Sequence, residues 1–88
     1  MQIKPNFKKR KLGRDYIVTA EGPSRVNFNK MIVLNESASY LWDEVFGSDF
    51  SAEDLENLLL QRYDVAPSIA HDDAMKVAEQ WREAGLLI

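Results

Sequence analysis

The sequence has 88 residues and a net charge of −3; 45% of the residues are hydrophobic, 28% are charged, and none is a cysteine. A chain of this kind forms one small domain with one modest core, which leaves little room for a deep catalytic pocket. The missing cysteines exclude disulfides, thiolate catalysis and thiolate metal sites, and the acidic balance argues against a general nucleic-acid binder. No apolar run is long enough to span a membrane and residues 1–7 lack the core of a signal peptide, so we expect a cytoplasmic protein that binds no membrane.

The first part of the chain shows the short periodicity of β-strands. A basic stretch, Phe7–Leu12, is followed by Gly13-Arg14, which is the right length for a tight hairpin turn. Asp15–Thr19 is rich in β-branched and aromatic residues, as strands are. Met31–Leu34 is a continuous apolar run. These segments predict three short strands.

The pattern changes near Asn35, after which the periodicity is helical. Asn35 is a suitable N-cap for a helix that begins at Glu36 and ends near Gly47. A second helix begins after Ser51, which with Asp54 forms a variant of the capping box. The buried stripes expected for the two helices are Leu34, Ala38, Leu41, Trp42, Val45 and Phe46 in the first, and Leu55, Leu58, Leu59 and Tyr63 in the second.

The third helix is predicted from about Pro67 to Ala84. Proline suits the first helical position, although Ala66 is then a poor cap. Gly85 supplies the left-handed residue that ends many helices, after which Leu86 can fold back toward the helix. The expected fold class is α+β: three short strands followed by three helices, in the manner of a winged helix-turn-helix. We expect one domain over residues 1–88, with residues 1–6 as a candidate flexible end.

Side chains that could carry catalysis are few. His71 is the only histidine, and its helical neighbours Ser68 and Met75 do not suit a metal. No serine stands in a nucleophile elbow, and the four glycines are too scattered for a phosphate loop. We therefore expect no catalytic residues, no metal and no cofactor, although an enzyme subunit remains one hypothesis.

The basic run Lys8–Lys11 has three interpretations that the sequence leaves open. It could bind nucleic acid, protect an edge strand from aggregation, or meet an acidic partner. A winged-helix DNA-binding regulator is the alternative function. The third helix, however, would have to enter the major groove, and it carries more carboxylates than cations, which phosphates repel. The residues concerned are Asp72, Asp73, Glu79 and Glu83 against Lys76 and Arg82.

The predicted third strand has apolar residues on both faces. So small a protein can hardly cover a sheet twice, so one face or the edge could stay open. An extended peptide could then add to this edge as a further strand. Simple core packing explains the same composition equally well.

Three segments, taken in order, resemble a known family. They are Pro23 with Met31-Ile32-Val33-Leu34-Asn35-Glu36-Ser37-Ala38 and Leu41-Trp42, then Tyr63-Asp64-Val65 with Pro67, then Trp81-Arg82-Glu83-Ala84-Gly85-Leu86-Leu87. Together they resemble PqqD-like proteins over about Lys4 to Leu87. That resemblance implies a small winged-helix-like domain without catalytic activity.

The resemblance also implies a function. PqqD-like domains bind the leader of a ribosomally made precursor peptide and present it to a modifying enzyme, which in the founding pathway is a radical S-adenosylmethionine protein. In related recognition elements the leader lies as an extra strand against the third strand, beside the third helix. Carried over, the candidate peptide-binding residues are Met31, Ile32, Val33 and Leu34 on the strand and Asp73, Val77 and Gln80 on the helix.

Two features differ from the family members that make pyrroloquinoline quinone. The Glu21–Lys30 connection is longer, and Ala66 stands where a serine is usual. The resemblance therefore points at least as well to another peptide-modification pathway. The precursor peptide, the modifying enzyme and the oligomeric state are not given by the sequence.

Overall fold

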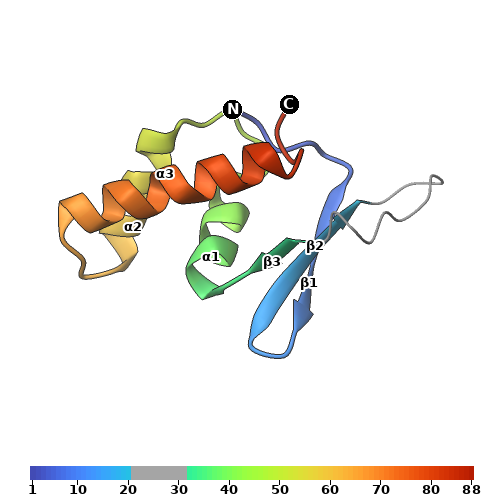
Figure 1. The fold of residues 1–88 in the computed structure, drawn as a ribbon, viewed down its shortest axis with the longest axis horizontal. Helices are drawn as coiled ribbons and strands as arrows, with labels where there is room; N and C mark the ends of the chain where they lie inside the picture. Colours follow the sequence, from blue (N-terminus) through green and yellow to red (C-terminus); the bar gives the residue numbers. More distant parts are fainter. Residues whose placement is uncertain (21–31) are drawn as a thin grey trace.

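The computed structural model describes residues 1–20 and 32–88. Three antiparallel strands come first and three helices follow, which confirms the α+β architecture expected from the sequence. The helices gather on one side of the molecule and the β-hairpin extends away from them (Figure 1). The elements are β1 (Phe7–Leu12), β2 (Asp15–Ala20), β3 (Ile32–Leu34), α1 (Glu36–Val45), α2 (Ala52–Arg62) and α3 (Pro67–Glu83).

The sheet has the order β1-β2-β3, so β3 is an edge strand among the described strands. Gly13 has a φ of 64° at the first position of the two-residue turn between β1 and β2. Glycine adopts this backbone without strain, which explains the tight hairpin. The pleat turns Val18 and Leu34 toward the helices, where they are buried, and turns Val33 to the other face.

The first two helices begin where their capping residues predict. The Asn35 side chain accepts a hydrogen bond of 2.9 Å from the Ala38 amide. Ser51 Oγ accepts from the Asp54 amide at 3.1 Å, and Asp54 Oδ2 accepts from the Ser51 amide at 2.9 Å. Each pair satisfies amides that would otherwise lack a partner at the start of a helix, so the local sequence fixes both helix starts.

Helix α3 has no side-chain cap at its start but is closed by backbone hydrogen bonds at its end. Ala66 caps it without a side-chain hydrogen bond, as expected. At the other end the Leu86 amide donates to the Trp81 carbonyl at 3.0 Å and the Gly85 amide donates to the Arg82 carbonyl at 3.1 Å. These two hydrogen bonds form a Schellman motif. The motif needs a residue with a left-handed backbone, and Gly85 supplies it with a φ of 76°. The chain is thereby turned back across the helix.

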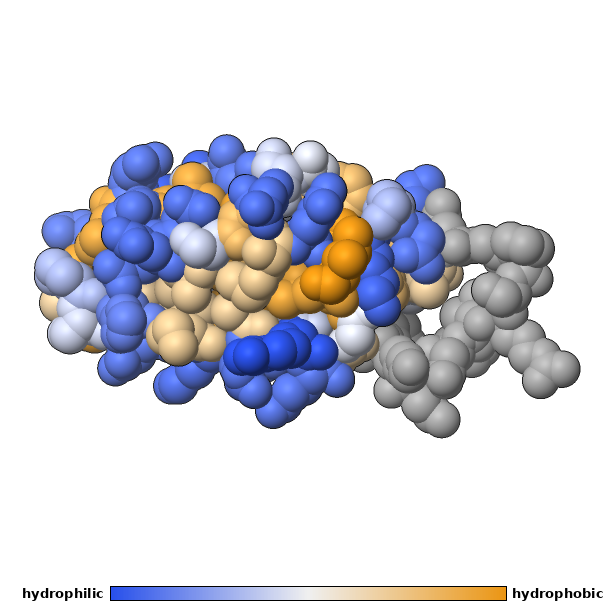
Figure 2. Space-filling view, turned by 90° about the horizontal axis from the view of Figure 1, so that it is seen from above, coloured by the Kyte–Doolittle hydropathy of each residue, from blue (hydrophilic) through white to orange (hydrophobic). Residues whose placement is uncertain are grey.

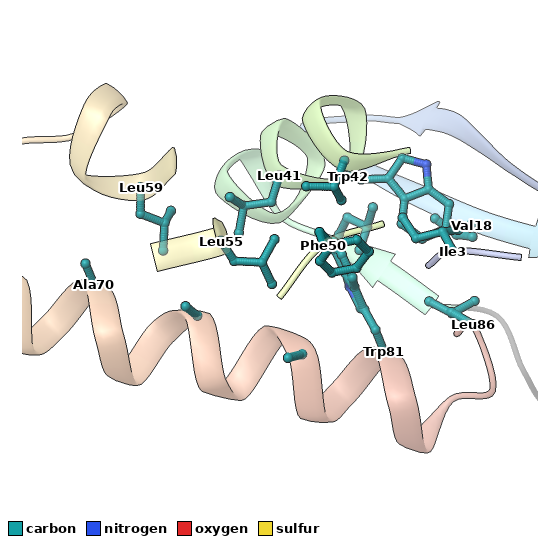
Figure 3. Close-up of a cluster of buried hydrophobic side chains, with 14 residues drawn as sticks. Ile3, Val18, Leu41, Trp42, Phe50, Leu55, Leu59, Ala70, Trp81 and Leu86 are labelled. Atoms are coloured by element: carbon teal, nitrogen blue, oxygen red, sulfur yellow. The ribbon is translucent and has the colours of Figure 1, made fainter. Parts of the chain in front are cut away.

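Aromatic side chains from three segments meet at the centre of the core. The Trp81 ring lies 5.4 Å from the Trp42 ring and 6.1 Å from the Phe50 ring, centroid to centroid, and both contacts are edge-to-face. In Figure 3, Leu55 and Leu59 of α2 point toward α3. The facing residues of α3 are the buried alanines Ala70, Ala74 and Ala78, which allow the two helices to approach closely.

The first residues of the chain are part of this core. Ile3 is only 2% exposed and forms an isolated antiparallel bridge with Leu87. The Lys4 amide donates to the Leu86 carbonyl at 2.8 Å, and the Phe50 amide donates to the Met1 carbonyl at 2.7 Å. The sequence suggested a flexible segment at residues 1–6, whereas the structure gives its first four residues a role in closing the core.

Candidate functional site

A groove of about 380 Å³ lies between the edge strand β3 and helix α3. The two elements run in opposite directions in Figures 1 and 3, and an extended segment paired with the three residues of β3 would lie between that strand and α3. The groove is lined by Asp15, Val33, Leu34, Asn35, Ser37, Ala38, Leu41, Leu59, Asp73, Lys76, Val77 and Gln80.

The floor of the groove is apolar. Leu34, Leu41 and Leu59 are at most 5% exposed and come from β3, α1 and α2. They are core residues whose other sides pack against the rest of the hydrophobic core. Val33 is 60% exposed at the rim. This arrangement suits an apolar side chain inserted from an extended segment that keeps its backbone along β3.

One stripe of α3 forms the opposite wall. Asp73, Lys76, Val77 and Gln80 have the spacing that places helical residues on one face, and all four line the groove. Val77 is half-buried against the core, while the three polar residues are exposed. The helix wall therefore offers one apolar contact among polar groups that can hydrogen-bond or pair with charges.

Most of the residues expected at the site do line it. Val33 and Leu34 on β3, and Asp73, Val77 and Gln80 on α3, meet in the groove. Ile32 packs against the hydrophobic core from the sheet face shared with Leu34 and is not among the lining residues. Met31 lies outside the described residues.

Other lining residues were not expected from the sequence. Leu41 and Leu59 were assigned to the core, which is correct, but each also shows one side to the groove. Asp15 comes from the start of β2, far along the chain from α3. Lys76 could have been found, because it lies three residues after Asp73 and four before Gln80 on the same stripe.

The basic residues of β1 are divided between the two faces of the sheet. Lys9 points toward α1, where its Nζ donates to Ser39 Oγ at 2.6 Å and to Asp43 Oδ2 at 2.7 Å. The same Nζ lies 4.6 Å from the centre of the Tyr16 ring. Its side chain is 17% exposed. Lys9 is thus a structural link between the sheet and α1.

His71 is an exposed residue of α3. Its Nδ1 lies 2.5 Å from Glu56 Oε1 on α2, and 62% of the histidine side chain is exposed. Both line a second hollow of about 300 Å³ with Ala52, Glu53 and Met75. Within residues 1–20 and 32–88, no three side chains of the metal-binding types come together.

The face seen in Figure 2 carries an apolar band bordered by hydrophilic side chains. Exposed large hydrophobic residues occur in β1, β3, α2 and α3 and near both ends of the chain. In the part of the chain that the structure describes, no helix has the length and hydropathy needed to cross a membrane.

Comparison with known proteins identifies the family. Residues 16–87 match the family described as "Coenzyme PQQ synthesis protein D (PqqD)". The chain belongs to the PqqD family. No curated protein matches this PqqD-family chain in sequence. Among solved structures it is similar to TbiB1, which was determined in complex with the TbiA(beta) leader peptide. The two share 13% identity with a TM-score of 0.72, and the match covers 99% of this chain and 94% of TbiB1.

Proposed function

We propose that this PqqD-family protein is a non-catalytic adaptor that binds the leader of a ribosomally made precursor peptide. The leader would add as a strand to β3 in the groove beside α3, and the adaptor would present it to a modifying enzyme of the radical S-adenosylmethionine type. The observation that carries the proposal is the groove itself. It combines a strand edge, an apolar floor and a polar helix wall along one line.

Each part of the groove has a task in this mode of binding. The backbone of β3 supplies hydrogen bonds that do not depend on the guest sequence. Leu34, Leu41 and Leu59 receive an apolar side chain, and the burial of such a side chain is worth about 1.5–3 kcal/mol. Asp73, Lys76 and Gln80 select among guests by charge and hydrogen bonding. The structural similarity to TbiB1, a protein solved with a leader peptide, supports this assignment.

A DNA-binding role is the alternative. Helices α2 and α3 do pack as a helix-turn-helix pair. The second helix of such a pair must approach phosphates, and α3 carries four carboxylates against two cations. One of the two cations, Arg82, is already paired with Glu79. Electrostatic repulsion therefore opposes this alternative.

An NMR titration tests the proposal. Isotope-labelled protein is mixed with synthetic leader peptides encoded by short genes that lie beside its own gene. Strand addition predicts that the amide chemical shifts of β3, residues 32–34, change on binding. The amides of Asp73, Lys76, Val77 and Gln80 on α3 should change as well. Binding without shifts in this region would refute the groove as the site. A salt-sensitive affinity for duplex DNA, with no peptide binding, would favour the alternative instead.

Modified peptides test the strand-addition mode without altering the fold. Backbone N-methylation of the leader removes one hydrogen-bond donor at a time. In a strand, only alternate amides face β3, so only alternate N-methyl groups should weaken binding. Each effective position should cost about 0.5–1.5 kcal/mol, or roughly 2- to 12-fold in Kd. Equal losses at successive positions would contradict addition as a strand.

The strand edge can also be tested from the protein side. Replacing Ile32 by proline should abolish binding if the Ile32 N–H points toward the guest, because proline has no N–H. Val33→Pro is the matched variant, because the N–H groups of Val33 and Ile32 point to opposite edges of the strand. A melting curve for each variant separates loss of the ladder from loss of the fold.

A further inference from the structure

The walls of the groove carry charged side chains that are accessible to a guest peptide. Asp73 and Lys76 on α3 and Asp15 at the start of β2 all line the groove, and all three are exposed. Among the residues that the structure describes, none of these three side chains has an ion-pair partner. Their charges are therefore available to select a guest.

The two carboxylates lie toward the same end of the groove. Because β3 and α3 run in opposite directions, the N-terminal side of the α3 stripe, with Asp73, lies toward the end of β3 (Figure 1). Tyr16 pairs with Leu34, the last residue of β3, so Asp15 stands beside that end as well. The uncharged Gln80 lies at the other end of the stripe. The groove thus has an acidic end and a neutral end.

An apolar contact follows Asp73 at a spacing that fits an extended guest. Val77 lies four residues after Asp73, which is about 6 Å along a helix. Side chains on one face of an extended peptide repeat about every 6.7 Å. A guest that places one side chain beside Val77, above the buried Leu34, therefore places a second one, two residues away, beside Asp73. The residue between them points to the other face of the sheet.

The direction of the guest sets the order of these two side chains. Antiparallel strand pairs are more stable and more common than parallel pairs. A guest that is antiparallel to β3 runs in the same direction as α3 and passes Asp73 before Val77. The side chain beside the carboxylate thus comes two residues before the side chain that enters the apolar floor.

Lys76 adds discrimination along the same wall. It lies on the stripe between Asp73 and Gln80 and is exposed. Its ammonium group would repel a basic side chain placed further along the groove, and repulsion of this kind excludes wrong guests. A basic side chain is therefore favoured at the acidic end alone.

We propose that the groove selects peptides in which a lysine or arginine stands two residues before a large apolar residue. Asp73 pairs with the cation, Asp15 adds negative potential at the same end, and the apolar side chain lies beside Val77 on the groove floor. The inference rests on the proposed function, because it assumes an extended peptide paired with β3. It adds the side-chain chemistry of the guest and makes Asp73 a specificity-determining residue.

A charge-exchange experiment tests the proposal. Synthetic leader peptides encoded by short genes beside its own gene are made with each lysine or arginine replaced singly by alanine and by glutamate. Each large apolar residue is replaced singly by alanine. Calorimetric titration gives the Kd of each peptide for the wild type, Asp73→Lys and Asp72→Lys. Asp72→Lys is the matched control, since Asp72 is also exposed on α3 but does not line the groove. Melting curves establish that both variants fold.

A contact at Asp73 predicts a specific pattern of affinities. One basic residue, two positions before a sensitive apolar residue, should lose about 2- to 5-fold in affinity on replacement by alanine. Glutamate at the same position should cost about tenfold or more, because repulsion replaces attraction. Asp73→Lys should weaken the unchanged leader by a similar factor and bind the glutamate peptide within about threefold of the original pair. Asp72→Lys should change neither affinity by more than about twofold.

Other outcomes overturn the proposal. Equal affinities for the lysine and glutamate forms of the peptide, or a bound leader without a basic residue at this position, would refute selection by Asp73. Equal effects of Asp73→Lys and Asp72→Lys would show a general effect of net charge in place of a contact. A sensitive basic residue two positions after the apolar one would overturn the antiparallel order. If the wild type binds none of the leaders, the proposed function fails; leader binding that ignores every basic position refutes this inference alone.

Discussion

Val33 stands directly opposite Ile17 in the pairing of β3 with β2, yet 60% of Val33 remains exposed. The next residue, Leu34, is 2% exposed. The pleat of one short strand thus places an aliphatic residue in solvent beside a groove and its neighbour in the core. Exposed aliphatic groups beside a groove are candidates for contact with a guest rather than for stability.

Val33→Ser should separate affinity from stability. Because Val33 is exposed, its replacement should change the free energy of unfolding by less than about 1 kcal/mol. The loss of an apolar contact should weaken leader binding by about 1–2 kcal/mol, or roughly 5- to 30-fold. Calorimetric titration and urea unfolding measure the two quantities. Val65→Ser is the control, since Val65 is exposed but lies outside the groove; equal affinities of the two variants would argue against a contact at Val33.

Lys9→Ala should destabilise the fold. The substitution leaves the buried Ser39 hydroxyl without the ammonium donor and removes the contact with the Tyr16 ring. We expect the free energy of unfolding to fall by about 1–2 kcal/mol, a value reduced by the partial exposure of the Lys9–Asp43 pair. Lys11→Ala on the same strand should be close to neutral. Similar denaturation midpoints for both variants would show that the link to α1 contributes nothing.

Tyr63→Phe should leave the protein as stable as before or make it more stable. The Tyr63 hydroxyl is buried and has no hydrogen-bond partner among the described residues. The folded protein no longer has to bury an unpaired hydroxyl in the variant, so we expect the free energy of unfolding to rise by up to about 1 kcal/mol. Tyr40→Phe is the matched comparison, because the Tyr40 hydroxyl donates to the Leu58 carbonyl at 3.3 Å and that bond would be lost. A Tyr63→Phe variant that melts well below wild type would reveal a partner for the hydroxyl.

Gly85→Ala should weaken the end of α3. Gly85 has a φ of 76°, and a Cβ at this position would meet no atom within 4 Å, so the cost comes from the backbone alone. We expect a loss of about 1–2 kcal/mol, with a smaller loss for Gly85→Asn because asparagine tolerates the left-handed region better. Thermal unfolding of the two variants measures both values. If alanine and asparagine cost the same, backbone strain is not the cause.

The elements of this fold were predictable where a few neighbouring residues decide the structure. Asn35 and the Ser51–Asp54 pair cap helices through bonds that span three residues, and Gly85 ends α3 through bonds within one turn. The turn at Gly13 is equally local. Such features are written in consecutive residues, so a pattern in the sequence is enough to find them.

The candidate site was predictable only in part, because it joins distant segments. The stripe of α3 follows from helical periodicity, but nothing in the sequence brings Asp15, Leu41 and Leu59 to it. The burial of Ile3 depends on a bridge to Leu87 at the other end of the sequence. The inward direction of Lys9 depends on which face of the sheet α1 covers. Each of these facts is set by packing between elements.

The brevity of β3 has a consequence for how such an adaptor would work over time. The three described residues of β3 can form only a few main-chain hydrogen bonds with a guest peptide, so much of the affinity must come from side chains and the peptide should dissociate quickly. An adaptor that releases its peptide quickly can bind many peptide molecules one after another. A small number of adaptor molecules would then be enough for the modification of a much larger number of peptides.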